Sequence, residues 1–466
     1  MAKKETNPLV DTGLLGKIKT GVGIRKDAAK NVVQNGSIYG TFVAMNDSMR
    51  ICAETSACCW DKPIPELYED KAEYVAKRVR VGHTSVMEHS NFVTYFRVPI
   101  NYMEDLITFL TECDYLGTWA HKTNSGDGYH LLIGGSLRGY SDLYRETSDL
   151  NNVILKAITG ILKVYSNSAA FGDIGKLGLI DLDGFMNVDP TVNDTDIISS
   201  LYSESNDLFD VVSMDDMDKL VAKIWAIDPE VVYLLKVYDL LPFLTVTINF
   251  KNMSRIITQQ LCRHRNGITQ ESQRYVDYSK SAFNSPAKYV AKYDDTHKYA
   301  VRFGTSSPLM HMTLQELGEA MGSIYEQLNN PAITGNNYAL KREDARAYLP
   351  NNTICRKIYI TFTFKSLLKF LDLREDSAAQ AEIRHYATSI GDWWRSVSPF
   401  TSKEACQEYI KPKLLCAHNI SFSTSDLETA EEAVDVTVDD YIAAAGLDKE
   451  MESESAASEE VTTSAT

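Results

Sequence analysis

Apolar and polar positions follow regular periods through most of the chain. Three segments rich in β-branched and aromatic residues predict strands at 91–98 (NFVTYFRV), 243–250 (FLTVTINF) and 357–364 (KIYITFTF). Apolar residues recur at helical spacing in other segments, as in 217–227 and 314–329. Because strands and helices interleave, the pattern predicts an α/β (α+β) fold rather than an all-α or all-β fold.

Further helices are predicted from the same periodicity and from stop signals. An amphipathic segment at 66–81 ends at Gly82, which is a common residue at a helix C-terminus. The other predicted helices are 103–111, 151–165, 254–262, 366–373 and 377–397. Apart from the helices at 151–165 and 217–227, the region between 147 and 240 has the weakest pattern for secondary-structure prediction in the chain.

Charge is unevenly distributed. The net charge is −16, but thirteen carboxylates and one lysine lie between 426 and 466. That acidic stretch, rich in Ser, Ala and Thr, cannot bury enough apolar surface to order itself, so residues 424–466 are predicted to be a disordered tail. Residues 1–37 are interpreted as a leader. The rest of the chain is nearly neutral, which is compatible with an anionic substrate.

The bulk sequence predicts a cytoplasmic protein. No run of about 18 apolar residues is present, so no membrane span is expected. The first 20 residues lack the apolar core of a secretory signal. The eight cysteines include no C-x-x-C pair and no Cys/His cluster with zinc spacing, so we expect reduced thiols and no metal site.

The densest candidate chemistry lies at Arg263-His264-Arg265, followed by Ser272 and Arg274. Guanidinium groups stay charged and bind phosphate or carbonyl oxygens in a bidentate manner. The segment therefore predicts an anion site for a nucleotide or a phosphorylated cofactor. An isolated R-H-R would more often be a solvated basic patch, so the interpretation depends on other motifs.

Three other motifs support a site. The segment 82–89 (GHTSVMEH) connects a predicted helix to a strand, where functional residues are often placed. Arg346 lies one turn before a proline in EDARAYLP, and Arg374 lies between two predicted helices in LDLREDS. Each arginine alone would be read as a solvated side chain.

These four motifs, in this order, resemble the motif set of the flavin-dependent thymidylate synthases, the ThyX family. The resemblance covers roughly residues 38–100 and 244–400. It implies an enzyme that methylates dUMP to dTMP, with 5,10-methylene-tetrahydrofolate as carbon donor and FAD, reduced by NADPH, as hydride donor. It also implies a ThyX-like central sheet flanked by helices.

The resemblance assigns roles residue by residue. The catalytic positions would be His83, beside the flavin ring, Arg263 and Arg374. The flavin would be held by Ser85, Glu88, Arg263, His264 and Arg265. The dUMP-binding set would be Gln260, Arg263, Ser272, Gln273, Arg274, Arg346 and Arg374. Within this set Ser272 and Arg274 would face the phosphate, Arg346 and Arg374 would lie near the uracil, and no cysteine would be catalytic.

The chain departs from the family pattern in detail. Six residues, which we expect to form a loop joining the flavin and dUMP sites, separate Arg265 from Ser272, whereas the signature has seven. Thr363 and Lys369 replace two asparagines that are common in the family, and Ala378 replaces a histidine. Since those positions contribute to flavin binding in the family, we expect FAD affinity to be the property most affected.

A larger departure is the spacing between motifs, because about 145 residues separate the two predicted core strands. Residues 38–100 and 243–423 would be the two parts of the core, and 101–242 would be an insertion or a degenerate repeat of the core. In favour of a repeat, 92–113 resembles 243–262, and 142–146 resembles 372–375. A duplicated chain would form a homodimer, whereas an unduplicated one would form the tetramer of the family.

Two other functions remain open. The first is a non-catalytic ThyX-like nucleotide-binding protein that has lost its flavin chemistry. The second is a nucleic-acid-binding protein that uses the R-H-R segment. An extended basic surface with stacking aromatics would be expected for nucleic acid. The acidic composition and the scattered arginines disfavour it, so we expect no nucleic-acid partner.

Overall fold

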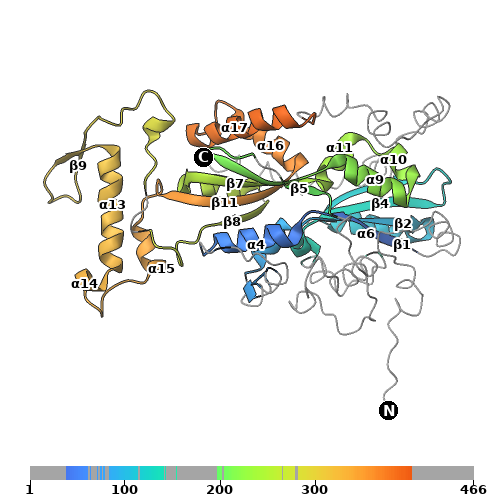
Figure 1. The fold of residues 1–466 in the computed structure, drawn as a ribbon, viewed down its shortest axis with the longest axis horizontal. Coiled ribbons are helices and arrows are strands. Elements are labelled where there is room, and N and C mark those ends of the chain that lie inside the picture. Colours follow the sequence, from blue (N-terminus) through green and yellow to red (C-terminus); the bar gives the residue numbers. More distant parts are fainter. Residues whose placement is uncertain are drawn as a thin grey trace, which may run out of the picture.

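The computed structural model describes residues 38–60, 83–113, 116–140, 197–201, 204–264, 266–278 and 282–400, and the single positions 63, 71, 74, 75, 77, 78, 142 and 154. Helices and antiparallel sheets are mixed in these residues, which confirms the α+β class (Figure 1). One central sheet was expected, but the described residues contain two large sheets, because residues 38–140 form a four-stranded sheet of their own.

The first sheet has the order β1-β2-β4-β3, and all its neighbours are antiparallel. Its strands are β1 (Tyr39–Met45), β2 (Phe92–Pro99), β3 (Gly117–Lys122) and β4 (Gly128–Gly135). Its helical elements are α4 (Ser48–Cys58), the 3-10 helices η1 (Thr84–His89) and η2 (Ile100–Tyr102), and α6 (Met103–Glu112). Only β2 and α6 were predicted from the sequence.

The second sheet has the order β5-β6-β7-β11-β8 and is also antiparallel. Its strands are β5 (Ser199–Leu201), β6 (Phe209–Asp215), β7 (Thr245–Ser254), β8 (Gly267–Gln270) and β11 (Ile354–Thr363). Predicted strands are confirmed at β7 and β11. The strand predicted at 243–250 begins later, because Leu241–Phe243 form a 3-10 turn (η6) that contains Pro242.

Helices cover the second sheet and connect its strands. These are α9 (Met217–Ile227), α10 (Pro229–Leu234), α11 (Val237–Leu240), α12 (Arg255–Leu261), η7 (Cys262–His264), α16 (Phe364–Glu375) and α17 (Ala381–Val397). Figure 1 shows α16 and α17 on one face of β7 and β11. The Thr363 hydroxyl accepts a hydrogen bond from the Ser366 backbone N–H and caps α16, so this departure from the family residue has a structural role.

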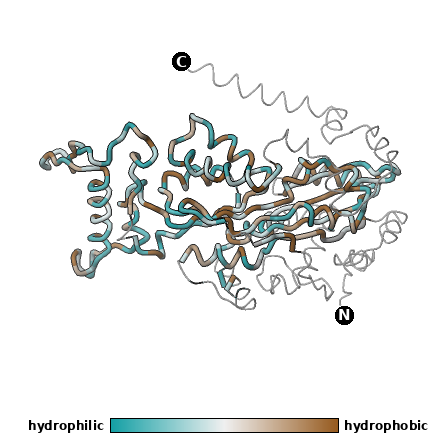
Figure 2. Tube along the Cα trace, turned by 45° about the horizontal axis from the view of Figure 1, so that its top comes forward, coloured by the Kyte–Doolittle hydropathy of each residue, from teal (hydrophilic) through white to brown (hydrophobic). Residues whose placement is uncertain are grey.

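A continuous hydrophobic core joins the two sheets. Buried side chains of the first sheet, such as Val93 and Tyr95, belong to the same cluster as Phe209 and Ile248 of the second. Figure 2 shows the hydrophobic segments running along the strands of the body. The two sheets therefore pack as one unit, and residues 38–140 are part of the core rather than an appendage.

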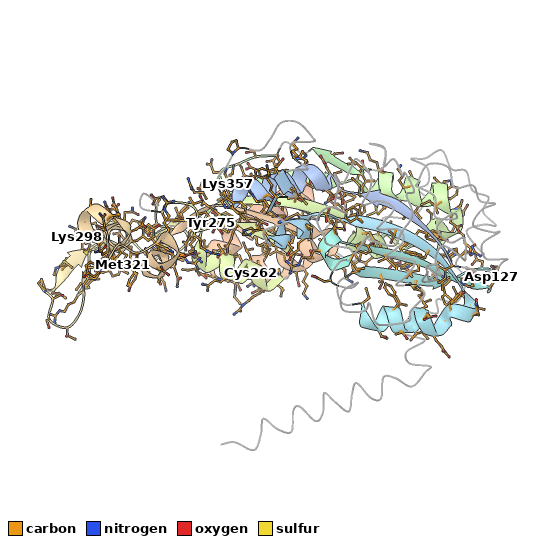
Figure 3. The ribbon with its side chains drawn as sticks, turned by 90° about the horizontal axis from the view of Figure 1, so that it is seen from below. Asp127, Cys262, Tyr275, Lys298, Met321 and Lys357 are labelled. Atoms are coloured by element: carbon orange, nitrogen blue, oxygen red, sulfur yellow. The ribbon has the colours of Figure 1, made fainter. Side chains whose placement is uncertain are left out.

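Between β8 and β11 the chain leaves the body as an arm, defined here as residues 271–353. It contains η8 (Pro286–Lys288), β9 (Tyr299–Val301), β10 (Met310–Met312), α13 (Leu314–Asn329), α14 (Pro331–Thr334), α15 (Arg342–Ala345) and η9 (Arg346–Tyr348). In Figure 3 Lys298 marks the arm, Asp127 the opposite end of the molecule, and Tyr275 lies between them.

Several expectations lie outside the described residues. These are the leader 1–37, the tail 424–466, the helix 151–165 apart from Ile154, and most of the helix 66–81. In the part of the chain that is described, no helix has the length and apolar character needed to cross a membrane.

Candidate active site

The segment that carries the first motif lies along the edge of the second sheet. Strand β8 is the last strand of that sheet, and η1 packs beside it. A Cβ atom on Gly267 would stand 2.5 Å from the Glu88 carbonyl oxygen, so only glycine permits this approach. Residues 84–89 and 267–270, far apart in sequence, are therefore neighbours in the fold.

His89 anchors this contact. Its ring nitrogens lie 2.9 Å from the Thr361 hydroxyl and 2.8 Å from the Thr269 hydroxyl, and the side chain is fully buried. Burial lowers its pKa to about 3, so the ring is neutral at physiological pH. A neutral imidazole needs one donor and one acceptor, which the two hydroxyls can provide. His89 lies within the first motif, but the family resemblance assigns no role to it.

An aromatic and cationic cluster surrounds His83. The His83 ring meets Trp60 edge-on at 4.9 Å, and Trp60 stacks on Tyr275 at 5.4 Å with 24° between the ring planes. The Arg78 guanidinium lies 4.4 Å from the Trp60 ring centroid. Neither Trp60 nor Arg78 was predicted as a site residue, because no spacing pattern links either residue to His83.

The expected phosphate group meets the arm. Arg274 forms an ion pair of 3.2 Å with Glu343, and Arg346 Nε donates to the Glu343 carbonyl oxygen at 3.0 Å. The Ser272 hydroxyl accepts the Arg274 backbone N–H, and the Ser272 backbone N–H donates to Cys59 O. Both backbone N–H groups thus have protein acceptors, which leaves the side chains of Ser272 and Arg274 as donors for an anion.

Gln273 and Asn266 hold buried amide nitrogens at opposite ends of β8. Neither Gln273 Nε2 nor Asn266 Nδ2 has a hydrogen-bond partner among the described residues. Gln273 is 4% exposed. Because an unsatisfied buried donor is costly, these amides are suited to a ligand or to water.

A second group lies at the other end of β8. Arg374 Nε donates to His264 Nε2 at 3.0 Å. An arginine cannot accept a hydrogen bond, so His264 Nε2 must be the acceptor and its proton must be on Nδ1. Partial burial, together with the charges of Arg374 and Lys369, lowers the pKa of His264 to about 4.

The remaining predicted residues extend this second group. Gln260 donates to Gln380, and Arg263 is exposed in η7, directly after α12. Arg265 lies outside the described residues. Ser85 is partly exposed on η1. Glu88 pairs with Arg138 at 3.0 Å, and burial raises the Glu88 pKa while Arg138 opposes the shift.

The stretch between the two groups was expected to be a loop, but it is a strand. Gly267–Gln270 pair with β11. A strand rises about 3.3 Å per residue, so its four residues separate the groups by roughly 13 Å. The structure thus brings His83, Ser272, Arg274 and Arg346 to one end of β8, and Arg263, His264 and Arg374 to the other.

No metal centre competes with this assignment in the described part of the chain, where no group of three or more His, Cys, Asp and Glu side chains could hold an ion. The donors are guanidinium, amide and hydroxyl groups beside aromatic rings. This set suits a phosphorylated, planar ligand such as a nucleotide or a flavin.

Comparison with known proteins gives the family. Residues 230–400 match the family described as thymidylate synthase complementing protein. Flavin-dependent thymidylate synthase of Thermotoga neapolitana is 32% identical over 114 residues, which are 24% of this chain and 50% of that protein. The Rickettsia bellii enzyme of the same name is 32% identical over 201 residues, 41% of this chain and 66% of its own length.

Residues 230–400 belong to the ThyX family. A third ThyX protein, from Pyrococcus furiosus, is 24% identical over 208 residues, 44% of this chain and 72% of its own length. The chain spans about half to two thirds of the first two relatives. The ThyX segment begins at α10 and includes β7, β8, the arm, β11, α16 and most of the predicted site residues.

Proposed function

We propose that the protein is a flavin-dependent thymidylate synthase, which converts dUMP to dTMP with methylene-tetrahydrofolate as carbon donor and NADPH as reductant. One observation carries the proposal. The segment with His83, Ser85 and Glu88 lies directly against the strand that joins His264 to Ser272. Two motifs of one family, about 180 residues apart in sequence, thus line one edge of the sheet.

The residues fit the group that this reaction requires. FAD has a flat ring system and a diphosphate, and it supplies hydride chemistry when bound. Ser85, Glu88, Arg263, His264 and Arg265 would hold it. His264, neutral with its proton on Nδ1, can donate a hydrogen bond at pH 7 without carrying charge, because Arg374 fixes its tautomer.

The arginines would bind and polarise dUMP. Arg274, the Ser272 hydroxyl and the neighbouring Arg346 would bind dUMP from the side of the arm, while Arg374, at the other end of β8, would stabilise negative charge that develops on the pyrimidine. Guanidinium groups held in place by Glu343 and His264 can do this with little reorganisation. The described cysteines are free thiols, and burial raises the pKa of Cys52, Cys58, Cys59 and Cys355, which makes these four poor nucleophiles.

Tritium release from 5-tritiated dUMP tests the proposal. Purified protein would be incubated with FAD, NADPH and methylene-tetrahydrofolate, and each would be omitted in turn. We expect release only in the complete mixture, and at least a tenfold lower rate in Arg274→Ala. Glu319→Gln, on the exposed side of α13, is the control. Bound FAD and dUMP without release would instead favour the non-catalytic nucleotide-binding protein.

A further inference from the structure

The two sheets repeat one topology. The first sheet has the order β1-β2-β4-β3, and the second has the order β6-β7-β11-β8 with β5 added at its edge. In each sheet the first strand is followed by an eleven-residue helix, α4 or α9, and the second by a shorter helix, α6 or α12. Every strand pairs antiparallel to its neighbours in both.

The registers agree residue by residue. Phe92 pairs with Gly135 as Val246 pairs with Phe362. Gly117 pairs with Gly134 as Gly267 pairs with Thr361. When the strands of the two sheets are aligned in order, one alignment without gaps inside a strand reproduces the residue pairing of all three neighbouring strand pairs. In this alignment Phe92 is equivalent to Val246, and Gly117 is equivalent to Gly267.

A β-bulge falls at the same place in both sheets. The register shifts between Phe42 and Ala44 in β1, and between Val211 and Ser213 in β6. In the alignment above, these two pairs of residues are equivalent. A bulge inserts one extra residue and is a local, specific feature, so its recurrence at one position is strong evidence of common origin.

Contacts between the halves are reciprocal. The Glu88 carbonyl oxygen faces Gly267, and the equivalent Pro242 faces Gly117, where a Cβ would lie 3.2 Å from the proline Cβ. His89 meets Thr361, and its equivalent Phe243 covers Gly134, where a Cβ would lie 2.5 Å from the ring. Reciprocal contacts of equivalent residues are the property of an interface with twofold symmetry.

The two junctions differ in chemistry. Beside Gly267 stand His89 and Glu88, with Arg274 beyond. At the equivalent positions of the other junction stand Phe243 and Pro242, and β3 is followed by the hairpin turn that contains Asn124, where β8 is followed by the arm that contains Arg274. The carboxylates after α9 are already paired, because Asp228 accepts from the Tyr95 hydroxyl at 3.0 Å and Glu230 from the Asn124 backbone N–H at 2.6 Å.

We propose that residues 39–135 and 209–363 are two copies of one folding unit, packed about an approximate twofold axis, and that only the junction of η1 with β8 binds a nucleoside monophosphate. The second part rests on the function proposed above. The other junction is closed by Phe243 and Pro242, so each chain has one such site.

A double-mutant cycle tests the duplication on the full chain. His89→Phe alone should lower the thermal midpoint, because Phe would clash with Thr361 and remove the His89 partner of the buried Thr269 hydroxyl, while Thr361 keeps its hydrogen bond to Thr247. Adding Thr361→Gly copies the Phe243–Gly134 pair, so the combined midpoint loss should be clearly smaller than the sum of the two single losses. Phe243→His with Gly134→Thr is the matched reverse cycle. Strictly additive losses in both cycles would overturn the duplication.

Equilibrium dialysis with radiolabelled dUMP tests the single site. We expect saturation at one dUMP per chain, a loss of at least tenfold in affinity in Arg274→Ala, and no change in Asn124→Ala, in the turn that follows β3 at the other junction. Two dUMP per chain would overturn the one-sided assignment. No binding at all would overturn the proposed function and the ligand assignment, while the mutant cycles would still decide the duplication.

Discussion

Glu343 contacts two arginines of the proposed dUMP site, one of which is the proposed phosphate ligand Arg274. Its carboxylate pairs with Arg274, and its carbonyl oxygen accepts from Arg346. Both side chains of the ion pair are about half exposed, so the pair contributes at most about 1 kcal/mol. A dianionic phosphate would have to displace this carboxylate and would also be repelled by it.

Glu343→Gln should therefore tighten dUMP binding. We expect a Kd about two- to fivefold lower at low salt, since surface electrostatics are screened as ionic strength rises. Isothermal titration at two salt concentrations would measure the difference. Glu319→Gln makes the same charge change on α13 and should leave the Kd unaltered. A weaker affinity in Glu343→Gln would show that Glu343 orders the arginines instead.

His89 should make the fold sensitive to acid. Its pKa is lowered in the folded state, so between about pH 6.5 and 3 the unfolded chain binds the extra proton. The free energy of unfolding should fall with decreasing pH, by about 1.4 kcal/mol per pH unit for this one group. The free energy of unfolding, measured by urea denaturation at several pH values in that range, should depend less on pH in His89→Gln. His385→Gln, at an exposed histidine, should keep the pH dependence of the original protein.

At the scale of elements, the arm depends on two glycines. Cβ atoms at Gly318 and Gly322 of α13 would lie 2.8 and 2.6 Å from the Phe283 ring, so the helix and the ring are in close contact. Figure 2 shows α13 as mostly hydrophilic, which leaves this contact as one of few apolar anchors. A small cluster of Val276, Tyr278, Tyr325 and Ala345 provides another.

Gly318→Ala should loosen the arm. Overpacking of this kind costs about 1–3 kcal/mol, and the β8–β11 connection would bear the strain. Limited proteolysis should cut the arm faster in the variant, and dUMP affinity should fall because Arg346 belongs to the arm. Ser323→Ala, exposed on the same helix, is the control. Equal proteolysis of both variants would mean that Phe283 can move aside.

Sequence periodicity found the elements with strong patterns and missed those without them. Helices α9 and α13 were predicted with their observed bounds, and β2, β7 and β11 are apolar enough to be recognised. Strands β1, β3, β4 and β6 were missed. β3 is only half-buried, so no run of apolar residues marks it. β4 does contain an apolar run, Leu131 to Ile133, but three of its eight residues are glycines, which are depleted in strands.

The site residues also divide into those that the sequence predicts and those that it does not. Residues within motifs were found, because a motif is local in sequence. Trp60 and Arg78 were not, since their contact with His83 and Tyr275 depends on how α4 meets the end of β8. The ion pair between Arg274 and Glu343 also depends on the path of the arm, which cannot be predicted from a local sequence pattern.

For the whole molecule, the duplication predicts the assembly. If each chain contains two units, a homodimer would hold four, whereas an unduplicated chain would need a tetramer for the same number. Light scattering should give a mass twice that of the 52.2 kDa chain. A monomer or a tetramer would contradict this prediction. The measurement should be made at low and high salt, because the net charge of −16 opposes association at low ionic strength.

The difference between the two junctions has a consequence for inheritance. In a symmetric pair of identical subunits, one codon specifies both copies of a residue, so a phenylalanine that closes one junction must also replace the histidine in the other. In a fused chain His89 and Phe243 are encoded separately. Selection could then preserve one junction while the other drifted toward simple packing, a division of labour that no symmetric ancestor could have reached.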